Sequence, residues 1–286
     1  MNNAKTVGLL AFMAVLLVLV AQGLGASPGT ALAIAAVFNL GAYFFSYKIA
    51  LASSRAKPVE EHELPRVYGI VRKLALKAEM PMPRIYLIDS PQPNAFATGR
   101  SPKHAAVAVT SGIMQVMNFS ELEGVLAHEL AHVRNRDILI SSIAAMLAAA
   151  LTILARMAFW FGGSRDRDNP LGAVGAILAL IVGPIAAMFI RFAISRAREY
   201  QADASGAAIT GQPMQLASAL EKIGQATSRI PMQVNPAVSQ LFIENPLKAF
   251  GRRGGGGVMS LMSTHPPIED RIRRLQEMAY GPGPIR

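Results

Sequence analysis

The chain has 286 residues, of which 52% are hydrophobic and 16% are charged, and its formal net charge is +10. This composition is too apolar for an ordinary soluble protein of this length, so we expect a membrane protein. Lysines and arginines that border membrane spans meet anionic lipid headgroups, which explains the positive charge without nucleic acid. The predicted partner is therefore the lipid bilayer, and no nucleic-acid partner is expected.

A first pair of membrane spans is predicted at the N-terminus. Residues 6–47 include no charged side chain, and the turn-forming run ASPG at 26–29 divides them. We expect a transmembrane hairpin over residues 1–51, with spans at about 7–24 and 30–50. A second span follows at once and no convincing cleavage site separates the two, which indicates a retained anchor rather than a signal peptide.

Residues 52–137 are predicted to form the first part of a domain outside the membrane. Apolar residues at helical spacing predict a helix over about 60–79. Short apolar runs predict strands over 84–88 and 105–110, which flank a loop over 89–99. The sequence therefore predicts a mainly helical domain with a small β-sheet.

The most specific pattern in the chain is HELAH at residues 128–132. In this H-E-x-x-H pattern, His128 and His132 project from one face of a helix onto a zinc ion, and Glu129 lies beside the metal-bound water. This arrangement is typical of a metal-dependent hydrolase. The alternative is a structural helix that happens to carry two histidines.

The residues before the motif predict where its helix begins. Ser120 and Glu123 have the spacing of a capping box. The apolar stripe behind them is the one expected of a buried helix face, and it comprises Leu122, Val125, Leu126 and Leu130.

A second transmembrane hairpin is predicted over residues 138–190, with spans at about 138–160 and 171–190. Residues 191–286 are predicted to complete the domain that 52–137 begins, because neither part alone has the size of a complete core. The chain is thus expected to be a multi-pass membrane protein.

The orientation follows from the cations near the ends of the spans, which gather on one side of the membrane. These residues are Lys5, Lys48, Arg55, Lys57, Arg134, Arg136, Arg191, Arg196 and Arg198. On the other side, Arg165 and Arg167 are interleaved with Asp166 and Asp168. Both termini and the HELAH motif are therefore predicted to be cytoplasmic.

A catalytic zinc site needs a third protein ligand. The chain has no cysteine, and the extended metzincin motif is excluded because Asn135 and Ile138 stand where it requires glycine and histidine. The best candidate is Glu199, which follows the second hairpin on the same side of the membrane. Asp203, one helical turn later, is expected to orient a histidine ring. The alternative is a surface helix whose acids pair with neighbouring arginines.

The expected chemistry is hydrolysis of a peptide bond. Glu129 accepts a proton from the zinc-bound water and returns it to the leaving amine. His265 is a candidate donor to the oxyanion, although its segment also suits a helix start. Asn94, Ala95 and Phe96 are candidate substrate-binding residues that an extended peptide joins as an added strand, and a plain turn is the alternative. Both pairs of interpretations remain open.

Four segments together resemble the HtpX family of membrane-bound zinc metalloproteases. They are HELAH at 128–132, SRAREYQAD at 195–203, PNAFATG at 93–99 and STHPP at 263–267. The resemblance covers nearly the whole chain and implies a gluzincin-like metalloprotease domain, in which an H-E-x-x-H motif is completed by a glutamate.

The resemblance also implies specific roles. By comparison with the family, His128, His132 and Glu199 bind one zinc ion per subunit and Glu129 is catalytic. The family implies a protease of the bacterial inner membrane that cleaves misfolded membrane proteins from the cytoplasmic side, in membrane protein quality control. Two other functions are disfavoured by the sequence. An intramembrane-cleaving protease is disfavoured by the charges just after His132, and a scaffold with a structural zinc is disfavoured by the intact Glu129.

Overall fold

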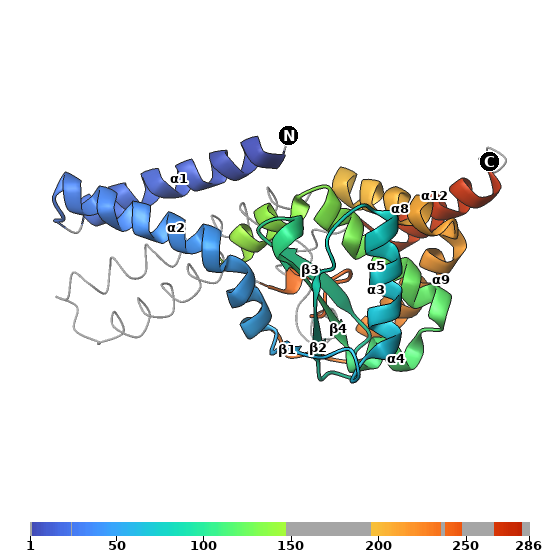
Figure 1. Ribbon diagram of the computed structural model, residues 1–286. Helices are drawn as coiled ribbons and strands as arrows, with labels where there is room; N and C mark the ends of the chain where they lie inside the picture. Colours follow the sequence, from blue (N-terminus) through green and yellow to red (C-terminus); the bar gives the residue numbers. More distant parts are fainter. Residues whose placement is uncertain (1, 24, 147–195, 236–237, 248–265, 282–286) are drawn as a thin grey trace.

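The computed structural model describes the chain except for residues 1, 24, 147–195, 236–237, 248–265 and 282–286. Two long helices extend from one end of a rounded body that contains a small sheet and further helices (Figure 1). The expected class, mainly helical with a small sheet, is confirmed for the described residues. Most of the predicted second hairpin lies outside them, and its described start is a helix over Asp137–Met146.

The N-terminal hairpin consists of α1 (Asn2–Gly23) and α2 (Pro28–Ser53), which lie side by side (Figure 1). Ser27 caps α2, because its hydroxyl accepts a hydrogen bond from the backbone N–H of Thr30 at 3.2 Å. Pro28 is favourable in the first turn, where its missing N–H has no helical partner to bond. Helix α1 begins five residues before the predicted span over 7–24, and α2 ends three residues after the predicted span over 30–50.

The sheet contains β1 (Lys57–Pro58), β2 (Arg84–Ile88), β3 (Ala95–Gly99) and β4 (Ala105–Thr110) in the order β1-β2-β4-β3. Strands β2 and β4 are parallel, whereas β1 and β3 are antiparallel to their neighbours. A short 3-10 helix, η1 (Pro102–His104), connects β3 to β4. The predicted limits of β2 and β4 are confirmed, but the loop expected before Gly99 is wrong, because its second half is β3.

Strand β3 could not be predicted from the sequence pattern because both of its faces are buried. Its five residues are all buried. Ala97 packs in the main core with α5, while Phe96 packs on the opposite face with Tyr47 and Leu51 of α2. A strand covered on both sides shows no alternation of polar and apolar residues, which is the usual signal of a strand.

Helix α3 (Pro65–Lys77) is shorter than the helix expected over 60–79. Proline disfavours a helical conformation for the residue before it, and Leu64 accordingly has φ −130° and ψ 59°. At the other end Glu79 adopts a positive φ of 54°, which stops the helix. The apolar face was therefore predicted correctly and the two ends were not.

Five further helices complete the described body: α4 (Ser111–Val116), α5 (Phe119–Arg134), α8 (Arg196–Thr210), α9 (Pro213–Thr227) and α12 (Ile268–Tyr280). Helix α5 packs on β3 and α4 on β4, while α3, α8 and α9 pack on α5 and α12 packs on α9 and α8. Together they enclose a continuous apolar core. The core includes Val67, Ile70, Val71, Leu74, Leu122, Val125, Leu126, Leu130, Leu216, Leu220, Ile223 and Leu275.

Helix α5 begins earlier than predicted. Its capping box is formed by Asn118 and Glu121, whose side chains each accept a hydrogen bond from the other's backbone N–H at 2.9 Å. The box expected at Ser120 and Glu123 is therefore wrong. Glu123 instead forms an ion pair with Lys73 at 2.8 Å. Two overlapping cap signals occur in the sequence, and the upstream one is used.

Candidate metal centre

The HELAH motif lies within α5, as predicted, and both histidines project from the same side of that helix. Positions four apart in an α-helix lie one above the other, which explains why the rings meet. The Nε2 atoms of His128 and His132 are 3.2 Å apart. Glu129 between them is only 2% exposed, so the motif faces the interior of the body.

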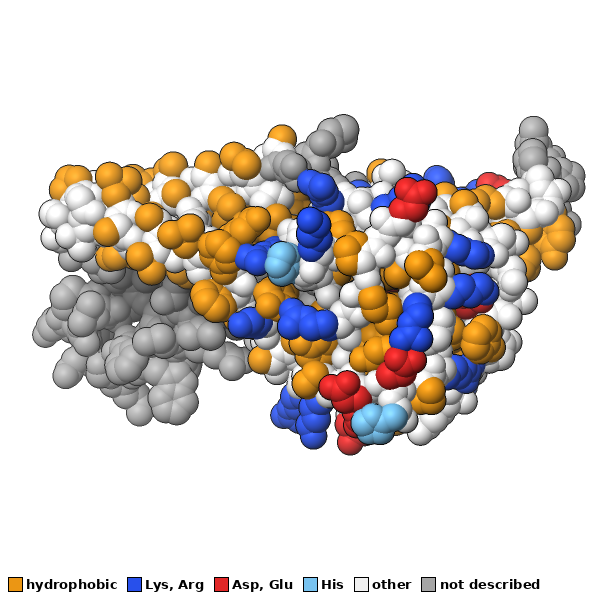
Figure 2. Space-filling model, in the orientation of Figure 1, with side chains coloured by type: hydrophobic (Ala, Val, Ile, Leu, Met, Phe, Trp, Pro, Cys, Tyr) orange, Lys and Arg blue, Asp and Glu red, His pale blue; other side chains and the backbone are white. Residues whose placement is uncertain are grey.

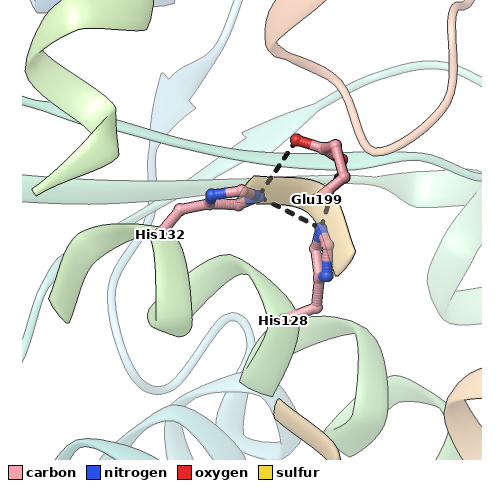
Figure 3. A group of neighbouring side chains, drawn as sticks. All are labelled: His128, His132 and Glu199. Atoms are coloured by element: carbon pink, nitrogen blue, oxygen red, sulfur yellow. Dashed lines mark hydrogen bonds and ion pairs between the residues drawn. The ribbon is translucent and has the colours of Figure 1, made fainter. Parts of the chain in front are cut away.

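Helix α8 brings Glu199 to the two histidines. Its carboxylate oxygens lie 3.5 Å from His132 Nε2 and 3.9 Å from His128 Nε2. One ligand atom from each of the three residues falls within 4.8 Å of the others, and the three side chains point toward a common centre (Figure 3). Glu199 is 6% exposed, which rules out the alternative of a surface acid.

Helices α5 and α8 approach closely because Gly206 has no side chain. A Cβ added at Gly206 would lie 2.9 Å from the backbone nitrogen of His128 and 3.1 Å from the carbonyl carbon of Ala127. These atoms belong to the backbone of α5, which cannot yield as a flexible side chain would. The glycine therefore permits the short distance between Glu199 and the histidines.

We expect Gly206→Ala to separate α8 from α5, to destabilise the protein by about 1–3 kcal/mol and to weaken metal binding. Gly69→Ala is the matched control, because a Cβ at Gly69 meets nothing within 4 Å and alanine favours helix α3. Thermal unfolding and metal titration of the two variants check the prediction. Equal metal affinity in both would contradict the role assigned to the close approach.

Two further carboxylates orient the histidine rings. Asp203 Oδ1 lies 2.9 Å from Nδ1 of His128, and Asp137 Oδ2 lies 3.2 Å from Nδ1 of His132. Each carboxylate accepts a hydrogen bond from the Nδ1–H, which leaves the Nε2 lone pair directed at the centre. Asp203 thus lies where the sequence predicted an orienting residue. The position of Asp137 was not foreseen, although it stands only five residues after His132.

The site shifts the pKa values of its own groups. Burial lowers the pKa of His128, and the Asp203 carboxylate opposes this shift without reversing it. Burial also acts to lower the pKa of His132, but the Glu199 and Asp137 carboxylates outweigh it and raise that pKa to about 9. Burial, with a further contribution from Glu199, raises the pKa of Glu129 to about 7.

The donor set fits a zinc ion. Two imidazole nitrogens and one carboxylate oxygen are a known ligand set for catalytic zinc, which keeps a fourth position open. Without a cation between them, the facing Nε2 atoms of His128 and His132 would set two lone pairs against each other at 3.2 Å. A proton on His132 or a metal ion between the two nitrogens relieves this conflict.

Glu129 is tied to the edge of the sheet. Its Oε2 accepts a hydrogen bond from the backbone N–H of Ala97 in β3 at 2.8 Å. A small cavity of about 40 Å³ borders Glu129 and the histidines. Its opposite wall is formed by residues 240–243, which include the end of the 3-10 helix η2 (Ser239–Leu241).

The predicted substrate-binding residues lie on β3 or directly before it, and two of their side chains are already engaged. The side chain of Asn94 donates to the carbonyl of Glu244 at 2.8 Å. The Phe96 ring packs against Phe242, with ring centroids 4.8 Å apart. At Ala95 the outward-facing carbonyl accepts a hydrogen bond from the N–H of Ile243 at 2.9 Å. His265 lies outside the described residues.

Sequence reasoning missed Arg271 altogether. This residue of α12 is fully buried and binds Asp203 through both carboxylate oxygens, at 2.7 and 2.8 Å. A charged residue in the middle of an amphipathic helix ordinarily faces water, so its type alone carried no signal. The one available hint is its spacing of three from Ile268 and four from Leu275, which places it on the apolar face of α12.

A pair of histidines on one helix, with a glutamate between them and a further glutamate from a neighbouring helix, defines a metallopeptidase. Comparisons with known proteins agree. Residues 61–279 match the model of peptidase family M48. The chain therefore belongs to peptidase family M48, and within it to the HtpX family of proteases.

The similar proteins include two curated relatives named protease HtpX homolog. The one from Thermodesulfovibrio yellowstonii is 51% identical and aligns over 98% of this chain and 99% of its own length. The one from Pelotomaculum thermopropionicum is 48% identical, over 98% of this chain and 100% of its own length. Both alignments span essentially the complete relatives.

Among solved structures, the chain is similar to S. mikatae Ste24p, with a TM-score of 0.51 and 18% sequence identity. The similarity covers 96% of this chain and 65% of that one, so the chain spans about two thirds of the solved protein. At this identity the comparison concerns the fold alone.

Proposed function

We propose that this metalloprotease is a zinc-dependent endopeptidase anchored in the bacterial inner membrane, with its active site on the cytoplasmic side. One observation carries the catalytic part of the proposal. The Nε2 atoms of His128 and His132 and the carboxylate of Glu199 converge within 4.8 Å, next to the buried Glu129. The proposed substrates are misfolded or membrane-embedded polypeptides, a class that rests on the resemblance to the HtpX family.

In the proposed mechanism, His128, His132 and Glu199 hold the zinc ion while Asp203 and Asp137 keep the two rings in the ligating tautomer. Zinc bound there would supply Lewis-acid chemistry for a peptide carbonyl and for the attacking water. Glu129 accepts the proton of the attacking water at its carboxylate and passes it to the leaving amide nitrogen. The buried carboxylate of Glu129, held by the Ala97 N–H beside the three ligands, is placed to take and return this proton.

We further propose that substrate lies extended along the outer edge of β3. Strand β3 is the last strand of the sheet, and edge strands bind peptides through backbone hydrogen bonds. Glu129 accepts a hydrogen bond from Ala97 at this edge, so the proton acceptor would lie beside the backbone of the bound substrate. Asn94 and Phe96 then support the edge through their own packing. The Ala95 carbonyl already accepts a hydrogen bond from the Ile243 N–H, so a substrate strand would have to displace residue 243 at this position. His265 remains a proposed donor to the oxyanion.

The membrane part of the proposal rests on the N-terminal hairpin. Of the described helices, α2 is long and apolar enough to cross a membrane, with a mean hydropathy of 1.5 in its most apolar stretch. Only 22% of that stretch is buried, unlike the core helix of a soluble protein. Figure 2 shows hydrophobic side chains along the length of the hairpin and lysines and arginines where it joins the body. The exposed large side chains include Val7, Phe12, Val15, Leu19, Leu32, Val37 and Leu40.

We propose the domain organisation that the sequence predicted: hairpins over 1–51 and 138–190 interrupt a single protease domain made of 52–137 and 191–286. The extensive packing of α5 on α8 supports the idea that the two domain segments fold as one unit. It also brings Glu199 to the histidines across the hairpin between them. The second hairpin itself lies mostly outside the described residues.

The orientation can be tested by cysteine labelling, because the natural chain has no cysteine. Ser27 lies between α1 and α2, and Gln276 lies on α12; both are exposed. We expect Ser27→Cys to react with a membrane-impermeant maleimide in intact spheroplasts and Gln276→Cys to react only after lysis. Labelling of Gln276→Cys before lysis would overturn the cytoplasmic assignment and leave the metalloprotease assignment in place.

The catalytic proposal is tested by the metal content and the peptidase activity of the purified full-length protein. We expect about one zinc ion per chain, loss of casein cleavage after chelation, and its return when zinc is added. A protein that cleaves casein equally well after complete removal of metal would refute the proposal.

A further inference from the structure

Arg271 is a buried cation that the proposed chemistry does not use. It lies on α12, close to the end of the chain, and is the largest fully buried side chain among the described residues. Removing a guanidinium from water is costly unless its donors are paired. The contacts of Arg271 therefore indicate what this burial achieves.

One group of contacts leads to the metal centre. Arg271 Nε and Nη2 donate to the two carboxylate oxygens of Asp203, at 2.8 and 2.7 Å. The same Asp203 carboxylate orients His128 through Nδ1 at 2.9 Å. Arg271 Nη2 also lies 3.4 Å from both ring nitrogens of His128, against the ring. Arg271 thus fixes the Asp203 carboxylate, which in turn orients the ring of His128.

Arg271 Nη1 lies 4.0 Å from Glu199 Oε2, and the same nitrogen also leads to the wall of the cavity. Arg271 Nη1 donates to the carbonyl of Ile243 at 3.2 Å. The N–H of Ile243 in turn donates to the carbonyl of Ala95, at the outer edge of β3. One guanidinium therefore joins α8, which carries Asp203, to the segment that borders the proposed substrate edge.

The electrostatics agree with a fixed, fully ionised pair. Burial acts to raise the pKa of Asp203, but the charge and hydrogen bonds of Arg271 outweigh it and hold that pKa well below its usual range. The opposite holds for Arg271, whose pKa is raised by Asp203 despite burial. Lysine would not replace these contacts, since its single ammonium lacks the planar fork that serves a carboxylate and a carbonyl together.

We propose that Arg271 is a positioning residue. It fixes the orientation of the His128 ring, through Asp203, and at the same time fixes the position of Ile243 in the wall of the cavity. This inference deepens the proposed function and rests on it. It assigns Arg271 no contact with the reacting atoms. Its consequence is that metal affinity and the binding of substrate depend on the same side chain.

The test compares Arg271→Lys with the parent protein and with Arg273→Lys, both as full-length protein. Arg273 is on the same helix but exposed, and it pairs with Asp270 and Glu277 at the surface. Three quantities are measured: the zinc dissociation constant against a competing chelator, the unfolding temperature without metal, and kcat and KM for a fluorogenic peptide at saturating zinc.

For Arg271→Lys we expect a zinc dissociation constant raised roughly 10-fold, in the range known for partners of metal ligands. We also expect a raised KM at saturating zinc, and parent values for Arg273→Lys. If Arg271→Lys had the parental zinc dissociation constant and the parental KM, the proposal would be overturned. A change in only one of them would show that Arg271 does not control metal binding and substrate binding together. If the parent binds zinc but cleaves no peptide, the proposed function fails while the zinc measurement still tests Arg271.

A second variant covers the case in which Arg271→Lys fails to fold. Asp203→Asn combined with Arg271→Met removes the two charges of this buried ion pair together, so neither partner of the pair is left charged alone. If this double variant unfolds near the parental temperature and its zinc affinity falls no further than that of Asp203→Asn alone, Arg271 acts through Asp203 and the positioning role is supported. Parental zinc affinity in the folded double variant would overturn it, because the pair would then serve stability alone.

Discussion

Glu129→Gln should retain the metal and lose peptide hydrolysis. The glutamine keeps the shape of the side chain and leaves the nitrogen and oxygen ligands of His128, His132 and Glu199 in place, but it cannot accept a proton. General bases typically contribute about 10²–10⁴-fold to a rate, so we expect turnover to fall by at least about 100-fold. Zinc content and cleavage of casein, measured on the same preparation, check this result.

The matched control for Glu129→Gln is Glu123→Gln. Glu123 is also a buried glutamate on α5, 5% exposed, but it pairs with Lys73 and does not line the cavity. It should lower stability slightly and leave turnover per folded molecule near the parental value. Turnover near the parental level in Glu129→Gln would remove Glu129 from the mechanism, and loss of zinc there would show that the residue supports the site in another way.

Glu199→Ala should lose most of the metal. Two histidines remain in this variant, and they form an incomplete site for zinc, which is held by three protein ligands in catalytic centres. We expect zinc to be retained by the parent and released by Glu199→Ala when metal is limiting and a chelator competes. Glu221→Ala is the control, since Glu221 is exposed on α9, away from the metal centre, and accepts a hydrogen bond from Gln225. Equal zinc occupancy in the parent and Glu199→Ala would mean that another residue is the third ligand.

Asp203 needs a gentler substitution than alanine. Removing its carboxylate leaves the buried Arg271 unpaired, and breaking a buried ion pair by removing one partner costs about 3–5 kcal/mol. Asp203→Asn keeps the shape of the side chain and one oxygen acceptor. Its zinc affinity should fall by ~10 to 100-fold, less than in Glu199→Ala, because Asp203 acts through His128 rather than on the metal.

The local elements of the site could be predicted from the sequence. The spacing of His128 and His132 is a property of a single helix turn, so no distant residue has to be known. Strands β2 and β4 are short apolar runs with clear limits, and both were predicted with their observed ends. Glu199 was predicted because an apolar hairpin is expected between it and His132. If that hairpin folds separately in the membrane, the helices that carry His132 and Glu199 become neighbours.

The remaining features depend on residues far apart in the chain. Strand β3 shows no alternation because α5 and α2 cover both of its faces. Helix α5 is capped by Asn118 rather than by Ser120, a choice that local spacing left open. Gly206 permits the close approach of α5 and α8, and the sequence alone does not show which surfaces of these two helices face each other.

By itself, the sequence determined the chemical identity of the donors and the helix that carries two of them, since both follow from local spacing. Only the tertiary structure decided which charges are buried and what they meet. Arg271 stands 68 residues from Asp203 and 143 from His128. Its burial follows from the packing of α12 against α8 and α9, because the free energy of a buried charge depends on the partners that the fold supplies.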